Sequence, residues 1–231
     1  MRTIWRWTVR AVLLALCAML IVQFWFLMHV WYWSSHNPDE TAFMQSRLEK
    51  MRETNPKAEL KHRWVPYSAI SPHLKRAIVA AEDAKFLDHD GFDWEAIQKA
   101  YEKNQKKGHI VSGGSTISQQ LAKNLFLSGE RTWWRKTQEA VVTVMIEAIW
   151  SKRRILEVYL NVIEWGNGVF GAEAAARFHY GIPASAINAE QAAHLAAMVP
   201  SPRRYLPGRD TPYLQHRAGI IMARMHLVQV P

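Results

Sequence analysis

The chain has 231 residues, of which 49% are hydrophobic and 21% charged, and this balance excludes a disordered tail or a low-complexity polymer. Lys and Arg outnumber Asp and Glu by 29 to 20, so the net charge of +9 favours an anionic partner: phosphate, nucleic acid or an acidic membrane surface. The single cysteine, Cys17, excludes an internal disulfide framework and a cysteine-based zinc site.

Residues 11–33 form an apolar stretch without Asp, Glu, Lys or Arg, which suits a helix crossing the hydrocarbon core of a membrane. Arginines precede it, and the positive-inside rule then leaves residues 1–10 in the cytoplasm. The alternative, a cleaved signal peptide, would have a shorter apolar region ending in small residues rather than in Trp31-Tyr32-Trp33. We therefore expect a single-pass anchor in the cytoplasmic (inner) membrane, with the remainder on the periplasmic or outer face.

Helical spacing of apolar residues dominates the remainder, and few alternating strand patterns compete with it. We expect a stalk over residues 34–60 and a mainly α domain over residues 61–231. Capping residues and Pro at first helical positions predict where the helices begin. The expected starts are Ser71-Pro72, Asp93, Ser115, about Thr132, Ser151, Asn188 and Thr211-Pro212.

An acidic pair, Glu82-Asp83, opens a first candidate constellation that extends to Asp93. Acidic pairs on helices are usually solvated. Here, however, the apolar run 77–81 precedes the pair, and a carboxylate set against an apolar wall has a raised pKa and can act as a base.

Paired glycines, Gly113-Gly114, precede a helix in the second constellation. The exposed N–H groups and positive dipole end of such a helix bind anions, and Gln119 and Lys123 at i and i+4 extend this site along one face. The alternative is a flexible turn with an ordinary Ser115 cap. A Walker A loop is excluded because no Gly-Lys-Ser/Thr follows the glycines.

Two further segments combine charge with apolar residues. In residues 131–139, cations flank Trp133-Trp134, a pattern that suits a surface facing anionic lipid headgroups, while Arg135 and Glu139 could form a simple surface ion pair. Taken alone, residues 152–161 indicate a structural helix with solvated or paired charges.

Together, and in this order, the four segments resemble the signature blocks of the peptidoglycan glycosyltransferases (glycosyltransferase family 51), over roughly residues 60–207. Residues 168–176 resemble the fifth, Gly/Ala-rich block, and residues 178–181 are a looser version of the usual aromatic-Gly segment. The four blocks read Glu-Asp-x-x-Phe-x-x-His-x-Gly-Phe-Asp at 82–93, Gly-Gly-Ser-Thr-Ile-x-Gln-Gln-x-x-Lys-Asn at 113–124, Arg-Lys-x-x-Glu at 135–139, and Lys-x-x-Ile-Leu-Glu-x-Tyr-Leu-Asn at 152–161.

This resemblance implies a lysozyme-like helical domain that polymerises lipid II, a disaccharide-peptide on undecaprenyl pyrophosphate. It also implies an inverting attack by the acceptor 4-hydroxyl, with Glu82 as general base and Glu139 as second essential carboxylate. No cofactor is obligatory and no metal-ligating residue is expected, although Mg²⁺ or Mn²⁺ can help to neutralise the diphosphate. The implied substrate-binding residues are Ser115, Thr116, Gln119, Gln120, Lys123, Asn124, Arg131, Arg135 and Lys136. The implied supporting residues are Asp83, Phe86, His89, Gly113, Gly114, Glu157 and Asn161.

The chain lacks the Ser-x-x-Lys and Lys-Thr-Gly motifs of penicillin-binding transpeptidases, so we expect a monofunctional enzyme. Its expected partners are lipid II, the growing glycan chain, the membrane and other cell-wall synthesis or division proteins. The predicted compartment argues against nucleic acid. Two alternatives stay open: a muramidase-like glycan hydrolase, and a non-catalytic, membrane-tethered cell-wall adaptor.

Overall fold

The computed structural model describes residues 2–109, 113–127, 132–209 and 211–231, and the chain divides into two compact units, Met1–Pro38 and Asp39–Pro231. The first unit contains one long helix, α1 (Arg2–Trp33). Its apolar part, Ile4–Trp33, is long and apolar enough to cross a membrane, which makes α1 a candidate single-pass anchor.

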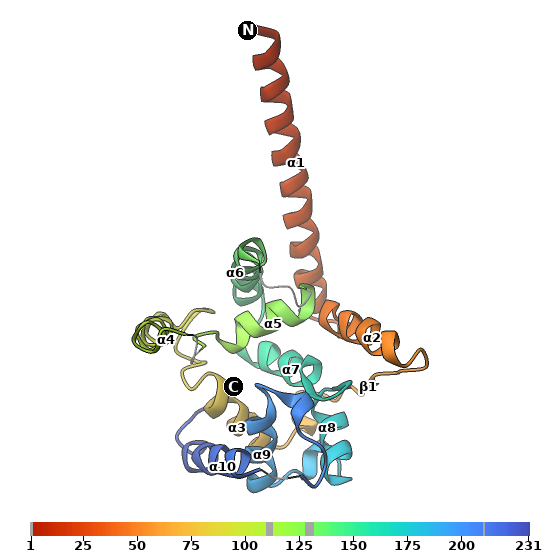
Figure 1. Ribbon diagram of the computed structural model, residues 1–231, viewed down its shortest axis with the longest axis vertical. Coiled ribbons are helices and arrows are strands. Elements are labelled where there is room, and N and C mark those ends of the chain that lie inside the picture. The colour runs from red at the N-terminus through yellow and green to blue at the C-terminus, as the bar shows by residue number, and fades with distance from the viewer. Residues whose placement is uncertain (1, 110–112, 128–131, 210) are drawn as a thin grey trace. The chain divides into compact units, whose positions relative to one another are not determined.

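The second unit is almost entirely helical (Figure 1), as the sequence predicts. A three-stranded sheet of order β1-β3-β2 is its only regular β-structure among the described residues; β3 pairs parallel to β1 and antiparallel to β2. Its strands are β1 (Lys61–His62), β2 (Glu164–Gly166) and β3 (Val169–Phe170). Its helices are α2 (Ala42–Thr54), α3 (Pro72–Glu82), α4 (Trp94–Lys107), α5 (Ile117–Phe126), α6 (Trp133–Ile149), α7 (Lys152–Val162), α8 (Ala172–Tyr180), α9 (Ala189–Met198) and α10 (Pro212–Arg224), with short 3₁₀ turns at Tyr67–Ala69, Ala184–Ala186 and Pro202–Arg204.

Capping side chains set most helix starts where the sequence predicts them. The Ser71 hydroxyl accepts from His73 N ahead of Pro72 in α3, and the Asp93 carboxylate accepts from Ala96 N in α4. Thr132, Ser151, Asn188 and Thr211 cap later helices in the same way. The predicted Ser115 cap of α5 is wrong. Thr116 caps that helix because it forms a reciprocal capping box with Gln119, three residues further on.

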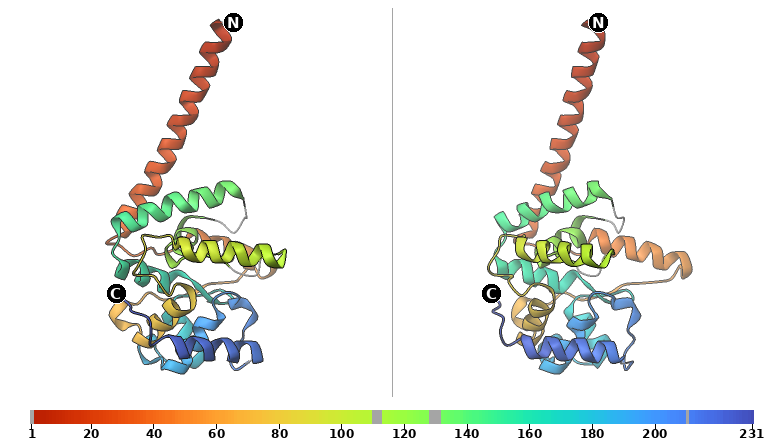
Figure 2. Two further views of the ribbon diagram at one scale, coloured as in Figure 1. Left: turned by 90° about the vertical axis from the view of Figure 1, so that its left-hand side faces the viewer. Right: turned by 60° about the vertical axis from the view of Figure 1, so that its left-hand side comes forward.

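Two groups of packed helices make up the second unit. Helices α5, α6 and α7 pack together, α3 packs against α9 and α10, and the views in Figures 1 and 2 show both groups. Trp165, Tyr159, Phe86 and Phe170 are the largest fully buried side chains of the core. Glu82, the predicted base, is the last residue of α3 and contacts Gln120 of α5, so it links the two groups.

The segment 34–60, which the sequence analysis treats as a stalk, contains α2, and the second compact unit begins at Asp39. Helix α2 packs against α5. The division of the chain into tail, anchor, stalk and domain stays a prediction.

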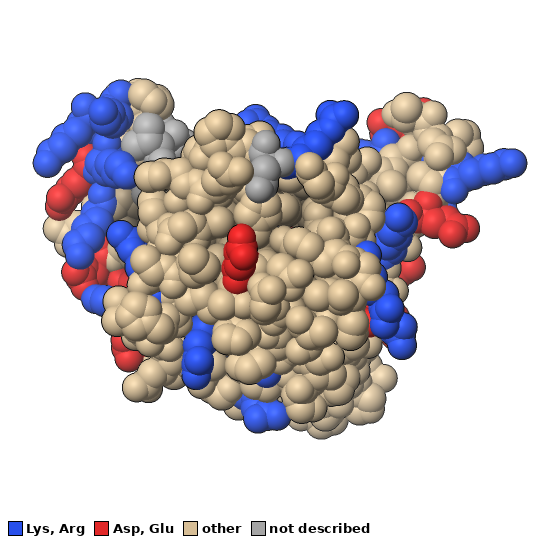
Figure 3. Space-filling model, turned by 90° about the horizontal axis from the view of Figure 1, so that it is seen from below, with Lys and Arg blue, Asp and Glu red and all other residues tan. Residues whose placement is uncertain are grey.

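Charged side chains are unevenly distributed over the second unit. Figure 3 shows the face formed by α8, α9 and α10, where Lys, Arg, Asp and Glu lie mainly toward the edges. The middle of this face therefore carries few charged side chains.

Candidate active site

Glu82 lies at the C-terminal end of α3, with a side chain that is 11% exposed. Gln120 Nε2 donates to Glu82 Oε2 at 3.0 Å, and an Arg217 guanidinium nitrogen lies 3.6 Å from Oε1. Burial raises the pKa of Glu82; the hydrogen bond from Gln120 and the charges of Arg217 and Lys123 oppose this increase without cancelling it. A carboxylate with a raised pKa is suited to accept a proton near neutral pH.

Asp83 connects the end of α3 to the beginning of α5. Its Oδ2 accepts from the amide of Ile117 at 3.0 Å, and its Oδ1 lies 2.9 Å from His89 Nε2. His89 Nδ1 in turn accepts from the amide of Gly91, so the Nε2 nitrogen carries the proton that His89 donates to Asp83. Asp83 is buried and fully bonded, and it therefore positions its neighbour Glu82.

Gln120 is held from its other side by a residue of α7. The Tyr159 hydroxyl donates to Gln120 Oε1 at 2.9 Å, which orients the amide so that Nε2 points at Glu82. Tyr159 is completely buried, and burial raises the pKa of its phenol well above the usual value. The hydroxyl therefore stays protonated and remains a donor.

Glu139 lies at the centre of a cluster of cations. It is buried in α6, one carboxylate oxygen accepts from Arg135 at 3.1 Å, and the other accepts from the Lys136 ammonium. Lys123 lies close enough for the charge of Glu139 to raise its pKa, although burial and the charges of Arg135 and Lys136 leave the pKa of Lys123 lowered overall. Positive charge thus exceeds negative charge in this cluster, which suits an anion.

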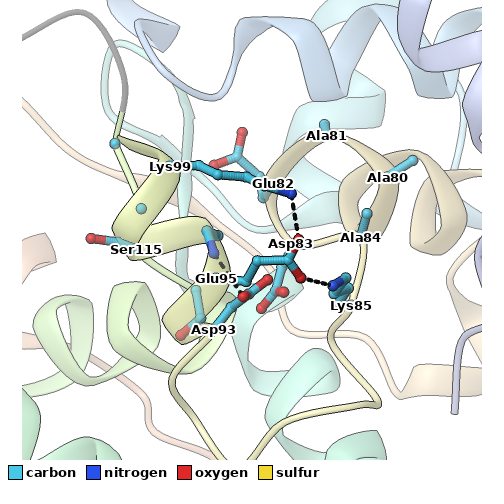
Figure 4. A pocket seen from close by; sticks show the side chains of 14 residues that line it. Ala80, Ala81, Glu82, Asp83, Ala84, Lys85, Asp93, Glu95, Lys99 and Ser115 are labelled. Atoms are coloured by element: carbon cyan, nitrogen blue, oxygen red, sulfur yellow. Dashed lines mark hydrogen bonds and ion pairs between the residues drawn. The ribbon is translucent and has the colours of Figure 1, made fainter. Parts of the chain in front are cut away.

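Two pockets lie beside the hydrogen-bonded pair of Glu82 and Gln120, the first lined by Glu82 and the second by Gln120. The first, of about 300 Å³, contains Glu82 with the small residues Ala80, Ala81 and Gly114 (Figure 4). Three charged side chains that also line this pocket are ion-paired: Glu95 pairs with Lys85 and with Lys99, as the dashed lines in Figure 4 show.

The second pocket, of about 350 Å³, lies on the other side of Gln120. Its wall includes Lys123, Asn124 and Arg135 from the cation side, together with Tyr159. Glu82 lines the first pocket and Gln120 lines the second, so the hydrogen bond between these two side chains places the predicted base next to the pocket that contains the cations.

The remaining predicted substrate-binding residues lie in different surroundings. Ser115 is exposed and lines the first pocket, whereas Thr116 and Gln119 are buried. Gln119 accepts from the Thr116 amide, and the Gln119 amide donates to Thr116 Oγ1. Two polar groups at the beginning of α5 are therefore bonded within the protein. Arg131 lies outside the described residues.

The predicted supporting residues are mostly buried in the framework. Phe86 is fully buried, with Lys152 Nζ 4.8 Å from its ring centre. Glu157 accepts from the amide of Tyr67, and the Asn161 side chain both accepts from and donates to the backbone of Val65. The chain before α3 is thereby fastened to α7. Gly113 and Gly114 both line the first pocket.

Sequence reasoning missed Arg217 and Tyr159 as site residues. Tyr159 belongs to the block at 152–161, so the resemblance contained a signal for it. Arg217 lies in α10, outside every block, and only the packing of α10 against α3 brings it to Glu82. As for metals, no group of three or more His, Cys, Asp or Glu side chains in the described part of the chain is placed to hold one.

Comparison with known proteins identifies the class of this site. A family model described as transglycosylase matches residues 47–226. Three curated relatives are named biosynthetic peptidoglycan transglycosylase. The relative from Nitrosospira multiformis is 62% identical over 98% of each chain, that from Azoarcus sp. is 59% identical over 100% of each, and that from Dechloromonas aromatica is 58% identical over 100% of each.

The helical domain and the family match thus define a glycosyltransferase with a lysozyme-like fold. The chain belongs to the transglycosylase family, and its activity is that of a peptidoglycan transglycosylase. This confirms the resemblance inferred from the four sequence blocks.

Proposed function

We propose that the protein polymerises lipid II into linear glycan strands by inverting glycosyl transfer, and that it is monofunctional. The observation that carries the proposal is Glu82, a carboxylate with a buried oxygen that lines the first pocket and bonds Gln120, which lines a second pocket containing Lys123 and Arg135. This arrangement suits two lipid-linked sugars that meet at one base.

In the proposed reaction, the first pocket holds the acceptor sugar and the second holds the reducing end of the growing chain. The acceptor 4-hydroxyl oxygen bonds to the anomeric carbon of the chain from one face, and the bond from that carbon to the pyrophosphate oxygen breaks on the other. Glu82 takes the hydroxyl proton, and undecaprenyl pyrophosphate leaves with the bonding electrons. The raised pKa of Glu82 supports this role because the carboxylate is a stronger base than an exposed glutamate.

The cation cluster supports binding of the departing diphosphate. Lys123 and Arg135 line the second pocket, and a diphosphate there would restore the pKa of Lys123 that burial has lowered. Arg131 joins this set by resemblance alone. Glu139 bonds Arg135 and Lys136, so we assign it to orienting these cations rather than to proton transfer.

These side chains supply the charge that a departing diphosphate requires, so we propose that no metal ion is obligatory and that Mg²⁺ or Mn²⁺ only assists. Polymerisation should persist in excess EDTA, with a modest fall at most. Complete loss in EDTA, with recovery on adding Mg²⁺ or Mn²⁺, would overturn this part of the proposal.

The outer face of α6 supports contact with the membrane in which both substrates are anchored. Trp133 and Trp134 are 91% and 66% exposed, and Val141 and Val144 continue the same uncharged face. We propose that this face enters the membrane interface on the outer side of the cytoplasmic membrane, with α1 as the anchor. Trp133→Ser with Trp134→Ser should weaken liposome binding and activity, whereas Trp94→Ser, at a 72% exposed tryptophan of α4, should leave both unchanged.

Polymerisation of purified lipid II by the detergent-solubilised chain tests the main proposal. Wild type should make polymer, Glu82→Gln should make none, and a labelled penicillin should not acylate the protein. Shortening of finished glycan with lipid II left intact would indicate a hydrolase instead. Preserved function of Glu82→Gln in a cell lacking the parent gene would indicate an adaptor.

A further inference from the structure

Arg217 is the residue of α10 that approaches the base. A guanidinium nitrogen lies 3.6 Å from Glu82 Oε1, and the side chains of Arg217 and Glu82 are 30% and 11% exposed. This separation is too long for a hydrogen bond, yet it is short enough for strong attraction between charges that are mostly out of water. The Arg217 Nε atom is buried and has no hydrogen-bond partner among the described residues.

The two oxygens of the Glu82 carboxylate differ in their hydrogen bonding. Oε2 accepts from Gln120, whereas Oε1 is buried and accepts no hydrogen bond from any residue that the structure describes. A carboxylate oxygen without a hydrogen bond keeps its lone pairs for an incoming proton. Oε1 is therefore the oxygen that has no hydrogen-bond donor of its own among the described residues, and Arg217 is the cation beside it.

Other charged groups around Glu82 do not provide the same contact. Asp83 follows it in the chain and opposes its ionisation, while Lys123 of α5, which lines the second pocket, favours its ionisation. The Tyr159 phenol of α7 is neutral and bonds Gln120. Lys85, in the segment directly after α3, and Lys99 of α4 also line the first pocket, and both are paired with Glu95.

We propose that Arg217 is a positioning residue for the glycosyl transfer, which holds Glu82 as the carboxylate and leaves the lone pairs of Oε1 free for the proton of the acceptor hydroxyl. This inference rests on the proposed function, in which Glu82 is the base. A guanidinium suits the task because it is charged at every pH of interest. Its distance also matters, since a direct hydrogen bond to Oε1 would compete with the hydroxyl for the same lone pair.

The test is the pH dependence of lipid II polymerisation by the full chain in detergent, comparing wild type with Arg217→Met. Loss of a cation within about 4 Å should move the acid limb of kcat/KM upward by about 1 pH unit, which is roughly a tenfold loss below the limb. Activity on the alkaline plateau should stay near that of wild type, because Glu82 ionises there without help. Arg217→Lys should shift the limb less, since it keeps a positive charge.

Arg224→Met is the matched control, because Arg224 lies on the same helix and is exposed. It should leave the profile unchanged, and thermal unfolding should show that every variant is folded. An equal loss at all pH values with an unmoved limb would overturn the inference and leave Arg217 a packing role, as would an unchanged profile. Activity in Glu82→Gln would be a separate failure, that of the proposed base.

Discussion

Gly113 and Gly114 are adjacent glycines with different surroundings, so alanine substitutions at the two positions should have different effects on packing. A Cβ built on Gly114 would lie 2.9 Å from Ile97 Cα and 3.2 Å from the Ala96 carbonyl oxygen. A Cβ on Gly113 would meet nothing within 4 Å. Gly114→Ala should therefore displace the first turn of α4, and Gly113→Ala should not.

The size of the effect follows from the distances. Carbon atoms in contact prefer about 3.5–4.0 Å, so the backbone of α4 must move by about 0.6 Å or more. Overpacking of this kind costs about 1–3 kcal/mol. For a domain of this size, the expected fall in Tm is about 2–12 °C. Because α4 carries Glu95 and Lys99 to the first pocket, polymerisation should also fall by about tenfold.

Thermal unfolding of the full chain in detergent, with lipid II polymerisation on the same samples, measures both effects. Gly113→Ala should be neutral or stabilising by up to about 1 kcal/mol, because Ala restricts the unfolded chain. Equal Tm values for the two variants would refute the packing argument. A normal rate in Gly114→Ala despite a lower Tm would refute the link between α4 and the acceptor pocket.

Three further predictions concern the groups around the base. Tyr159→Phe leaves Gln120 Oε1 without its donor and should lower kcat roughly fivefold, the equivalent of about 1 kcal/mol; an unchanged kcat in a polymerisation assay would contradict this. Asp83→Ala leaves the buried Ile117 amide without a hydrogen bond, so it should lower the free energy of unfolding by about 3 kcal/mol. Denaturant titration measures this loss, and a loss below about 1 kcal/mol would mean that Asp83 does not stabilise the beginning of α5. Burial raises the pKa of Glu82, so the folded state loses stability as pH rises through that pKa, and Glu82→Gln should have the higher Tm at neutral pH. The difference in Tm between the two proteins should shrink below the ordinary pKa of glutamate. A lower Tm for Glu82→Gln at pH 7 would show that the buried, ionised carboxylate does not destabilise the folded state.

Local sequence signals predicted the helices well because caps act over three or four residues. Ser71, Asp93 and Thr211 each bond an amide that the chain places next to them, whatever the rest of the fold does. The signal that distinguishes the true cap of α5, Thr116, from the wrongly predicted cap, Ser115, is also local. Gln119 lies three residues after Thr116 and completes a capping box that Ser115 cannot form with Ser118.

The site depended more heavily on resemblance, because its contacts join distant parts of the chain. The bond from Gln120 to Glu82 spans 38 residues, and that from Tyr159 to Gln120 spans 39. No periodicity or spacing rule predicts such pairs. Neither the spacing of residues nor the resemblance predicts Arg217. This residue lies in no sequence block, and its approach to Glu82 depends on how α10 packs against α3.

The first amides of α5 are already bonded, and this has a consequence for selectivity. Asp83 accepts from the Ile117 amide, and Thr116 accepts from the Gln119 amide, so the protein itself occupies two of the amides at the positive end of the helix. Small anions such as inorganic phosphate, which commonly settle at open helix ends, find little to bind beside the base. In the proposed reaction, the diphosphate would instead be bound by Lys123, two turns along α5, and by Arg135 of α6, and it would have to reach both cations at once. A helix end with bonded amides would then favour a large, tethered substrate over the abundant small ions of the surrounding solution.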